Sequence, residues 1–121
     1  MNHSLLYIED EESNICLVEA MLRRRPQIEL HVAMNGRDGV RAAIDKQPGL
    51  ILLDNHLPDA TGREILQELA STSATAAVPV VIFSGDSDEA IDELLASGAA
   101  ESVAKPFNIG QFIGIIDRYL A

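Results

Sequence analysis

The chain has 121 residues, of which 47% are hydrophobic, and this length and composition suit one compact domain with a buried core, spanning residues 1–121. Its formal net charge of −10 argues against direct binding to nucleic acid or to anionic membranes. Because no apolar stretch approaches the roughly 18 residues of a membrane helix and the N-terminus does not resemble a signal peptide, we expect a cytoplasmic protein without membrane insertion.

The first half of the chain alternates short apolar runs with segments of helical spacing. Residues 5–8 and 50–53 are too short for typical helices and lack the alternation of half-exposed strands, which predicts buried parallel strands. Apolar residues recur three or four positions apart within residues 17–22 and 40–44, which predicts two helices. The single cysteine, Cys16, precedes the first of these stripes, and we expect it to be buried as a small hydrophobe.

The second half of the chain continues this alternation. Thr61 with Glu64 resembles a helix capping box, residues 70–77 resemble a loop, and residues 78–83 form a third apolar strand. Further helical segments are predicted before Gly98, which suits a helix end, and from about Asn108 onward. The apolar stripe of the last helix comprises Ile109, Phe112, Ile113, Ile116 and Leu120.

Two weaker segments, residues 28–34 and 101–105, complete a series of five β-α units. Parallel strands need a covering layer on each side, and crossover connections are right-handed. The sequence therefore predicts an α/β fold: a single doubly wound five-stranded parallel sheet with helices on both faces.

The predicted strands end in polar functional groups. Glu9 and Asp10 follow the first run, Asp54 the second, Ser84 the third, and Lys105 closes the last. In an open parallel sheet these carboxyl ends meet near the point where the strand order reverses, so the five side chains should line one cleft. Three carboxylates and one ammonium leave a charge that one divalent cation would balance, with Mg²⁺ the natural choice and Mn²⁺ a substitute. A carboxylate beside such an ion can act as the nucleophile of phosphoryl transfer.

With these groups, the chain resembles the receiver domains of two-component response regulators, and the resemblance covers essentially its whole length. The matching pieces are Tyr7-Ile8-Glu9-Asp10, residues 52–59 with Gly62, Phe83-Ser84-Gly85 and Lys105-Pro106-Phe107. The resemblance implies a flavodoxin-like strand order 2-1-3-4-5. It also implies Asp54 as the phosphoacceptor, Asp10 as a direct Mg²⁺ ligand, Glu9 as a ligand through water, and the backbone carbonyl of His56 as a further ligand.

The resemblance also implies that Ser84 binds the phosphoryl oxygen after transfer, that Lys105 pairs with it, and that the Lys105–Pro106 peptide bond is cis. One departure from the family concerns its usual aromatic switch residue, whose position is occupied here by Ser102. The standard aromatic rotamer switch is therefore not expected, and the signal must pass through backbone movement or another side chain.

A second departure is His56, two residues after the acceptor. Asp86 lies two residues after Ser84. By resemblance both positions tune dephosphorylation, and we expect their substitution to change the lifetime of the phosphorylated state more than folding.

Three functions are compatible with this site. The first is a signalling domain that is phosphorylated by a sensor histidine kinase or a histidine phosphotransfer protein and then binds a downstream protein. The second is an aspartyl-nucleophile phosphohydrolase, although such enzymes typically have an aspartate where this chain has His56. The third is a phosphate-independent interaction domain, against which the retained Asp54, Lys105 and acidic pair argue. A free-standing receiver, a phosphorelay intermediate and part of a longer protein all remain open.

Overall fold

The computed structural model describes residues 2–85 and 88–120, and for residues 88–91 it describes the backbone alone. Within this part of the chain, strands and helices alternate strictly. The elements are β1 (Ser4–Ile8), α1 (Glu12–Leu22), β2 (Glu29–Ala33), α2 (Gly36–Lys46), β3 (Leu50–Asp54), α3 (Gly62–Ser71), β4 (Val80–Ser84), α4 (Asp88–Ala96), β5 (Glu101–Ala104) and α5 (Ile109–Leu120).

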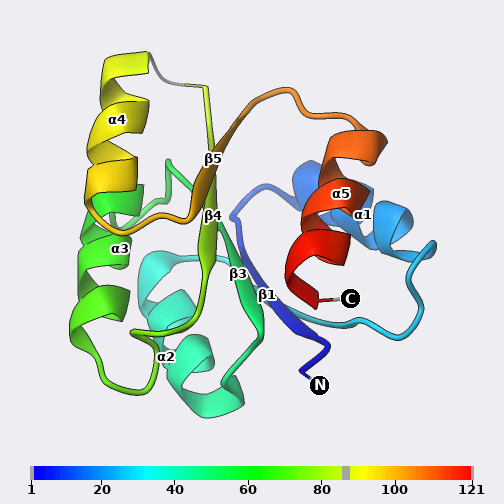
Figure 1. Ribbon diagram of the computed structural model, residues 1–121, viewed down its shortest axis with the longest axis horizontal. Coiled ribbons are helices and arrows are strands. Elements are labelled where there is room, and N and C mark those ends of the chain that lie inside the picture. The colour runs from blue at the N-terminus through cyan, green and yellow to red at the C-terminus, as the bar shows by residue number, and fades with distance from the viewer. Residues whose placement is uncertain (1, 86–87, 121) are drawn as a thin grey trace.

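All paired strands are parallel and form one five-stranded sheet in the order β2-β1-β3-β4-β5, which confirms the predicted fold. The order reverses at β1, because the chain crosses from β2 on one side of β1 to β3 on the other. Helices α1 and α5 cover one face of the sheet, and α2, α3 and α4 cover the other (Figure 1). No helix in residues 2–85 and 88–120 is long and apolar enough to span a membrane.

The sheet separates two apolar cores. Every residue of β3 and β4 is buried, as expected for central parallel strands that are covered on both faces. Side chains of alternate residues contribute to opposite cores, so Leu52 belongs to the core under α1 and α5, and Leu53 belongs to the core under α2 and α3. Asp54 is in phase with Leu52, and this alternation directs its side chain toward the α1 and α5 side.

Local sequence signals account for the start of α3 and the end of α4. The predicted capping box is confirmed, since the Thr61 hydroxyl accepts from the Glu64 amide and the Glu64 carboxylate accepts from the Thr61 amide. Gly98 has a φ of 118°, a left-handed conformation that favours glycine and ends α4 two residues after Ala96.

Three local expectations are corrected by the structure. Cys16 is exposed rather than buried. The reason is helical periodicity, because Cys16 lies two residues and therefore about 200° from the buried Val18, on the opposite side of α1. Helix α3 extends to Ser71, so the predicted loop at residues 70–77 begins two residues later. Strand β4 begins at Val80 rather than at residue 78, because Pro79 cannot donate a ladder hydrogen bond, and it includes Ser84.

Candidate functional site

Three carboxylates meet at the carboxyl edge of the sheet. Glu9 and Asp10 directly follow β1, and Asp54 is the last residue of the neighbouring strand β3. One side-chain oxygen of each residue lies within 4.8 Å of the others. Glu9 and Asp54 are buried, whereas Asp10 is exposed. The structure therefore brings together the acid pair and the carboxylate that the sequence singles out, and leaves one side of the cluster open to solvent.

Lys105 directly follows β5, the edge strand that β4 separates from β3. Its Nζ donates a hydrogen bond to Asp54 Oδ1 at 2.5 Å and so joins the acid cluster. The Lys105–Pro106 peptide bond is cis, as the resemblance implies. Phe107 stacks on Phe83 of β4 with ring centroids 4.6 Å apart, which anchors the segment that carries the lysine. Burial lowers the pKa of Lys105, but the hydrogen bond and charge of Asp54 outweigh this effect and raise it, so the ammonium stays charged.

Ser84 ends β4 and is fully buried. The Asn55 amide Nδ2 donates a hydrogen bond to the Ser84 hydroxyl at 3.3 Å, and the backbone nitrogen of Asn55 donates to the Phe83 carbonyl at 3.0 Å. Asn55 is itself buried and directly follows Asp54, so it links the end of β3 to the predicted phosphoryl-binding hydroxyl. The sequence alone did not single out Asn55, although a second polar residue directly after Asp54 and its apolar run is a signal that could have identified it.

Glu9 is the most strongly perturbed acid of the cluster. It is 1% exposed, and this burial raises the pKa of its carboxyl group to about 7. The hydrogen bond from Asn14 opposes the rise, and the negative charge of Asp54 adds to it. Without a cation, Glu9 therefore holds a proton more tightly than an ordinary glutamate does.

The residues of the cluster fit a divalent cation. Glu9 Oε2 is buried and, among the described residues, has no hydrogen-bond partner. Burying a carboxylate oxygen without a hydrogen-bond donor costs free energy, and a hard divalent cation is a partner that carboxylate oxygens bind well. Glu9, Asp10 and Asp54 together carry three negative charges and Lys105 one positive charge, so one Mg²⁺ would leave the cleft neutral.

Three further predicted site residues, His56, Asp86 and Ser102, are not among the groups of the acid cluster. His56 is exposed, and its backbone forms an isolated antiparallel bridge with Thr61. Asp86 lies outside the described residues. Ser102 pairs with Ile82 across the β4–β5 ladder, and its buried Oγ has no hydrogen-bond partner within the described part of the chain. The position of the usual aromatic switch residue thus contains a small hydroxyl side chain.

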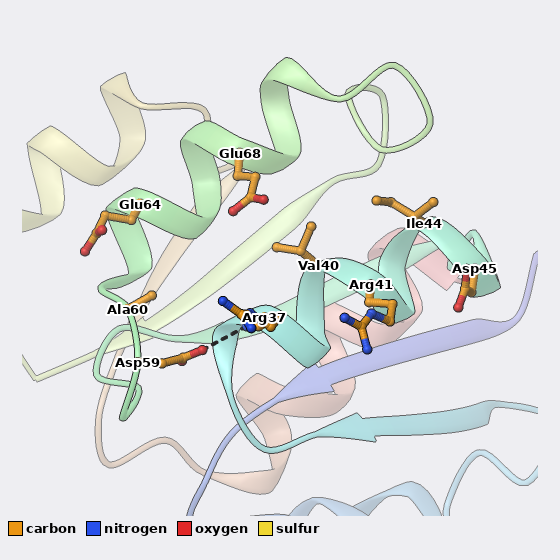
Figure 2. Close-up of a pocket in the computed structure, with 9 residues that line it drawn as sticks. All are labelled: Arg37, Val40, Arg41, Ile44, Asp45, Asp59, Ala60, Glu64 and Glu68. Carbon is orange, nitrogen blue, oxygen red and sulfur yellow. Dashed lines mark hydrogen bonds between the residues drawn. The ribbon is translucent and has the colours of Figure 1, made fainter.

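The loop that follows Asp54 is tied to helix α2. The Asp59 carboxylate accepts hydrogen bonds from the backbone nitrogens of Gly36 at 2.7 Å and Arg37 at 3.1 Å, and these bonds lower the pKa of Asp59. Figure 2 shows Asp59 and Arg37 at one end of a groove between α2 and α3. The groove has a volume of about 510 Å³, and its lining includes none of the predicted site residues.

Strand order and side chains together define a class of protein. The fold is an open, doubly wound α/β sheet, and its acid cluster lies at the carboxyl ends of β1 and β3, where the order reverses. Proteins of this class bind their ligands at that switch point. Here the converging carboxylates of Glu9, Asp10 and Asp54 supply oxygen ligands that suit a cation and phosphate chemistry.

Comparison with known proteins identifies the family. The family model for the response regulator receiver domain matches residues 5–117, and the chain belongs to this family. It is a receiver domain of the two-component type, a signalling domain, and its cluster of Glu9, Asp10 and Asp54 fits the magnesium-binding phosphoacceptor site of such domains.

Similar proteins include both free receivers and parts of longer chains. The chain is 26% identical to the polar-differentiation response regulator DivK of Brucella anthropi, covering 99% of this chain and 98% of DivK. It is 33% identical to a protein-glutamate methylesterase/protein-glutamine glutaminase of Geobacter sulfurreducens over 84% of this chain, but spans only 27% of that protein.

Solved structures show the same architecture. The receiver domain of a sensor histidine kinase from Pseudomonas aeruginosa, with a magnesium ion coordinated in its active-site cleft, superposes with a TM-score of 0.88 at 26% identity, covering 99% of this chain and 98% of that one. The chemotaxis response regulator CheY4 of Vibrio cholerae gives a TM-score of 0.89 at 25% identity, covering 99% and 100% of the two chains.

Proposed function

We propose that Asp54 accepts a phosphoryl group from a phosphohistidine in a reaction that requires Mg²⁺, or Mn²⁺ as a substitute. One observation carries this proposal: oxygens of Glu9, Asp10 and Asp54 converge within 4.8 Å while Lys105 donates to Asp54. The donor would be a sensor histidine kinase or a histidine phosphotransfer protein, and the receiver unit would extend over residues 1–121 of a cytoplasmic protein.

The cation would be held by Asp10 and Asp54 directly, by Glu9 through water and by the backbone carbonyl of His56. When bound, the cation supplies positive charge to the transferring phosphoryl oxygens. The buried Oε2 of Glu9 supports this assignment, since it has no hydrogen-bond partner among the described residues and a cation with its water shell would supply one.

Asp54 is the proposed nucleophile. One of its oxygens forms a bond to phosphorus while the bond from phosphorus to the histidine nitrogen breaks, and that nitrogen keeps the electron pair and takes up a proton. Lys105 would hold the Asp54 carboxylate in place before transfer and pair with a phosphoryl oxygen afterwards, and its hydrogen bond to Asp54 supports this role. The product is an aspartyl phosphate, in which the phosphoryl group stays covalently bound to the protein.

Switching requires that the phosphoryl group bind one conformation better than another. We propose that the Ser84 hydroxyl and Lys105 supply this difference by binding the phosphoryl oxygens. Because Ser102 occupies the position of the aromatic switch residue, the rearrangement at Ser84 would reach the surface through backbone movement or another side chain. His56 and Asp86 would tune the lifetime of the aspartyl phosphate, and their substitution should change the dephosphorylation rate more than it changes the unfolding transition.

The test is intact-mass measurement after incubation with acetyl phosphate. The parent protein should gain one phosphoryl group when Mg²⁺ is present and none after chelation, and Asp54→Asn should gain none in either condition. An equal adduct on Asp54→Asn would refute Asp54 as the acceptor. Steady hydrolysis of a phosphate ester by the parent would instead favour the phosphohydrolase alternative. Absence of any adduct on a folded parent protein would favour the phosphate-independent one.

A further inference from the structure

Asn14, in the first turn of α1, connects the helix to the acid cluster. Its Nδ2 donates a hydrogen bond to Glu9 Oε1 at 2.7 Å and a second one to Glu11 Oε2 at 3.0 Å. The two bonds use both hydrogens of the amide, so the side chain has one defined orientation. Asn14 therefore bridges a buried carboxylate of the cluster and an exposed carboxylate at its rim.

The hydrogen bond from Asn14 leaves the two carboxylate oxygens of Glu9 in different environments. Oε1 is occupied by the amide, whereas Oε2 is buried and has no hydrogen-bond partner among the described residues. A glutamate side chain has one more rotatable bond than an aspartate, and without a fixed partner its carboxylate would occupy several rotamers. The amide holds one rotamer in which the second oxygen stays available to the cluster.

We propose that Asn14 is a positioning residue for the metal site: it fixes the Glu9 carboxylate so that its free oxygen can bind the hydration shell of the divalent cation. This inference rests on the proposed function and adds a residue to it. Partners that orient metal-binding carboxylates commonly contribute ten- to a hundredfold to metal affinity. Asn14 suits this role because a neutral donor orients the carboxylate without competing for it as a lysine charge would.

A purely structural role for Asn14 makes a different prediction. Helix α1 begins at Glu12, and its N-cap residue Glu11 makes no side-chain capping bond. If Asn14 only stabilised this helix start, its loss would lower stability but would not act on metal binding through Glu9. The dependence on Glu9 therefore separates the two roles.

The experiment measures Mg²⁺ affinity by following the backbone amide signals of the ¹⁵N-labelled full chain during a MgCl₂ titration, without any phosphoryl donor. Asn14→Ala should raise the dissociation constant about tenfold or more, by the loss of an orienting partner. The matched control is Ser13→Ala, which changes an exposed polar residue on the same turn and should leave the constant within about twofold of the parent. Asn14→Leu, of similar size to asparagine, serves if the alanine variant does not give a folded spectrum.

The same titration in a Glu9→Gln background completes the test. There, Asn14→Ala should change the dissociation constant by less than about twofold, because the oriented carboxylate is gone. Parent-like affinity of Asn14→Ala, or an equal loss in both backgrounds, would overturn the positioning role while leaving the proposed function standing. A folded parent that binds no Mg²⁺ would overturn both.

Discussion

Glu9 makes the metal-free protein less stable, and its replacement should show by how much. The side chain is 1% exposed and its pKa rises from 4.5 to about 7 because burial penalises the charged form. Each pKa unit corresponds to about 1.4 kcal/mol, so keeping Glu9 ionised in the folded state costs about 3 kcal/mol at pH 8. Glu9→Gln keeps the acceptor for Asn14 and removes the charge, so it should stabilise the metal-free protein by up to this amount.

The pH dependence follows from the direction of the shift. A carboxyl group with a raised pKa binds its proton more tightly in the folded state, so it lowers stability as pH rises from 4.5 through about 7. The stability difference between Glu9→Gln and the parent should therefore be small near pH 4.5 and complete above about 7.5. Mg²⁺ should reduce the difference at high pH, because the cation compensates the ionised carboxylate only in the parent.

Urea unfolding in the presence of a chelator, followed by circular dichroism at several pH values, measures this effect. With a typical slope of about 1–3 kcal/mol per molar urea, the midpoint of Glu9→Gln should exceed that of the parent by about 1–3 M at pH 8. The control is Glu19→Gln, which removes one exposed negative charge from α1 and should not reproduce the pH-dependent gain. Equal pH profiles for the parent and Glu9→Gln would refute the argument that burial penalises the Glu9 charge.

Two further predictions concern packing and the β5–α5 contact. Gly62→Ala should lower the free energy of unfolding by about 1–3 kcal/mol, because the new Cβ would lie 2.6 Å from Asn55 Oδ1. Gly114→Ala has open space at its Cβ and should raise the free energy of unfolding by about 0.5–1 kcal/mol. Thermal unfolding of both variants checks these two changes. The Glu101 carboxylate accepts from the Tyr119 hydroxyl at 2.6 Å, and its pKa is lowered, so Glu101→Gln should destabilise the protein at pH 7 by less than about 1 kcal/mol. That difference should disappear as pH falls below 4.5, and a difference that persists in acid would contradict the contribution of the ionised form.

The sequence determined most of the fold in advance because its signals are local and strong. Apolar runs without alternation identified the central strands, and Thr61 with Glu64 identified the start of α3. The burial of Cys16 could not be judged in the same way, since a small residue contributes little to a helical stripe. Its exposure became clear only when the phase of α1 was fixed by Val18 and its neighbours.

Part of the candidate site could likewise be predicted from the sequence, and part could not. Strand ends pointed to Glu9, Asp10, Asp54 and Lys105, and these groups do converge in the structure. Asn14 was missed, because its relation to Glu9 depends on how the β1–α1 loop turns and on which side-chain rotamer results. The spacing of five residues between the two is not a regular helix or strand spacing, and it carries no contact prediction by itself.

Phosphoryl transfer should modify one carboxylate of the chain, that of Asp54. An aspartyl phosphate is an acyl phosphate, which borohydride reduces to the alcohol, so the marked aspartate becomes homoserine and can be located by tandem mass spectrometry. After treatment with acetyl phosphate and Mg²⁺, homoserine should be found at position 54 and should be absent when Mg²⁺ is chelated. Homoserine at another acidic residue, or none at position 54 of a folded and phosphorylated protein, would contradict the account.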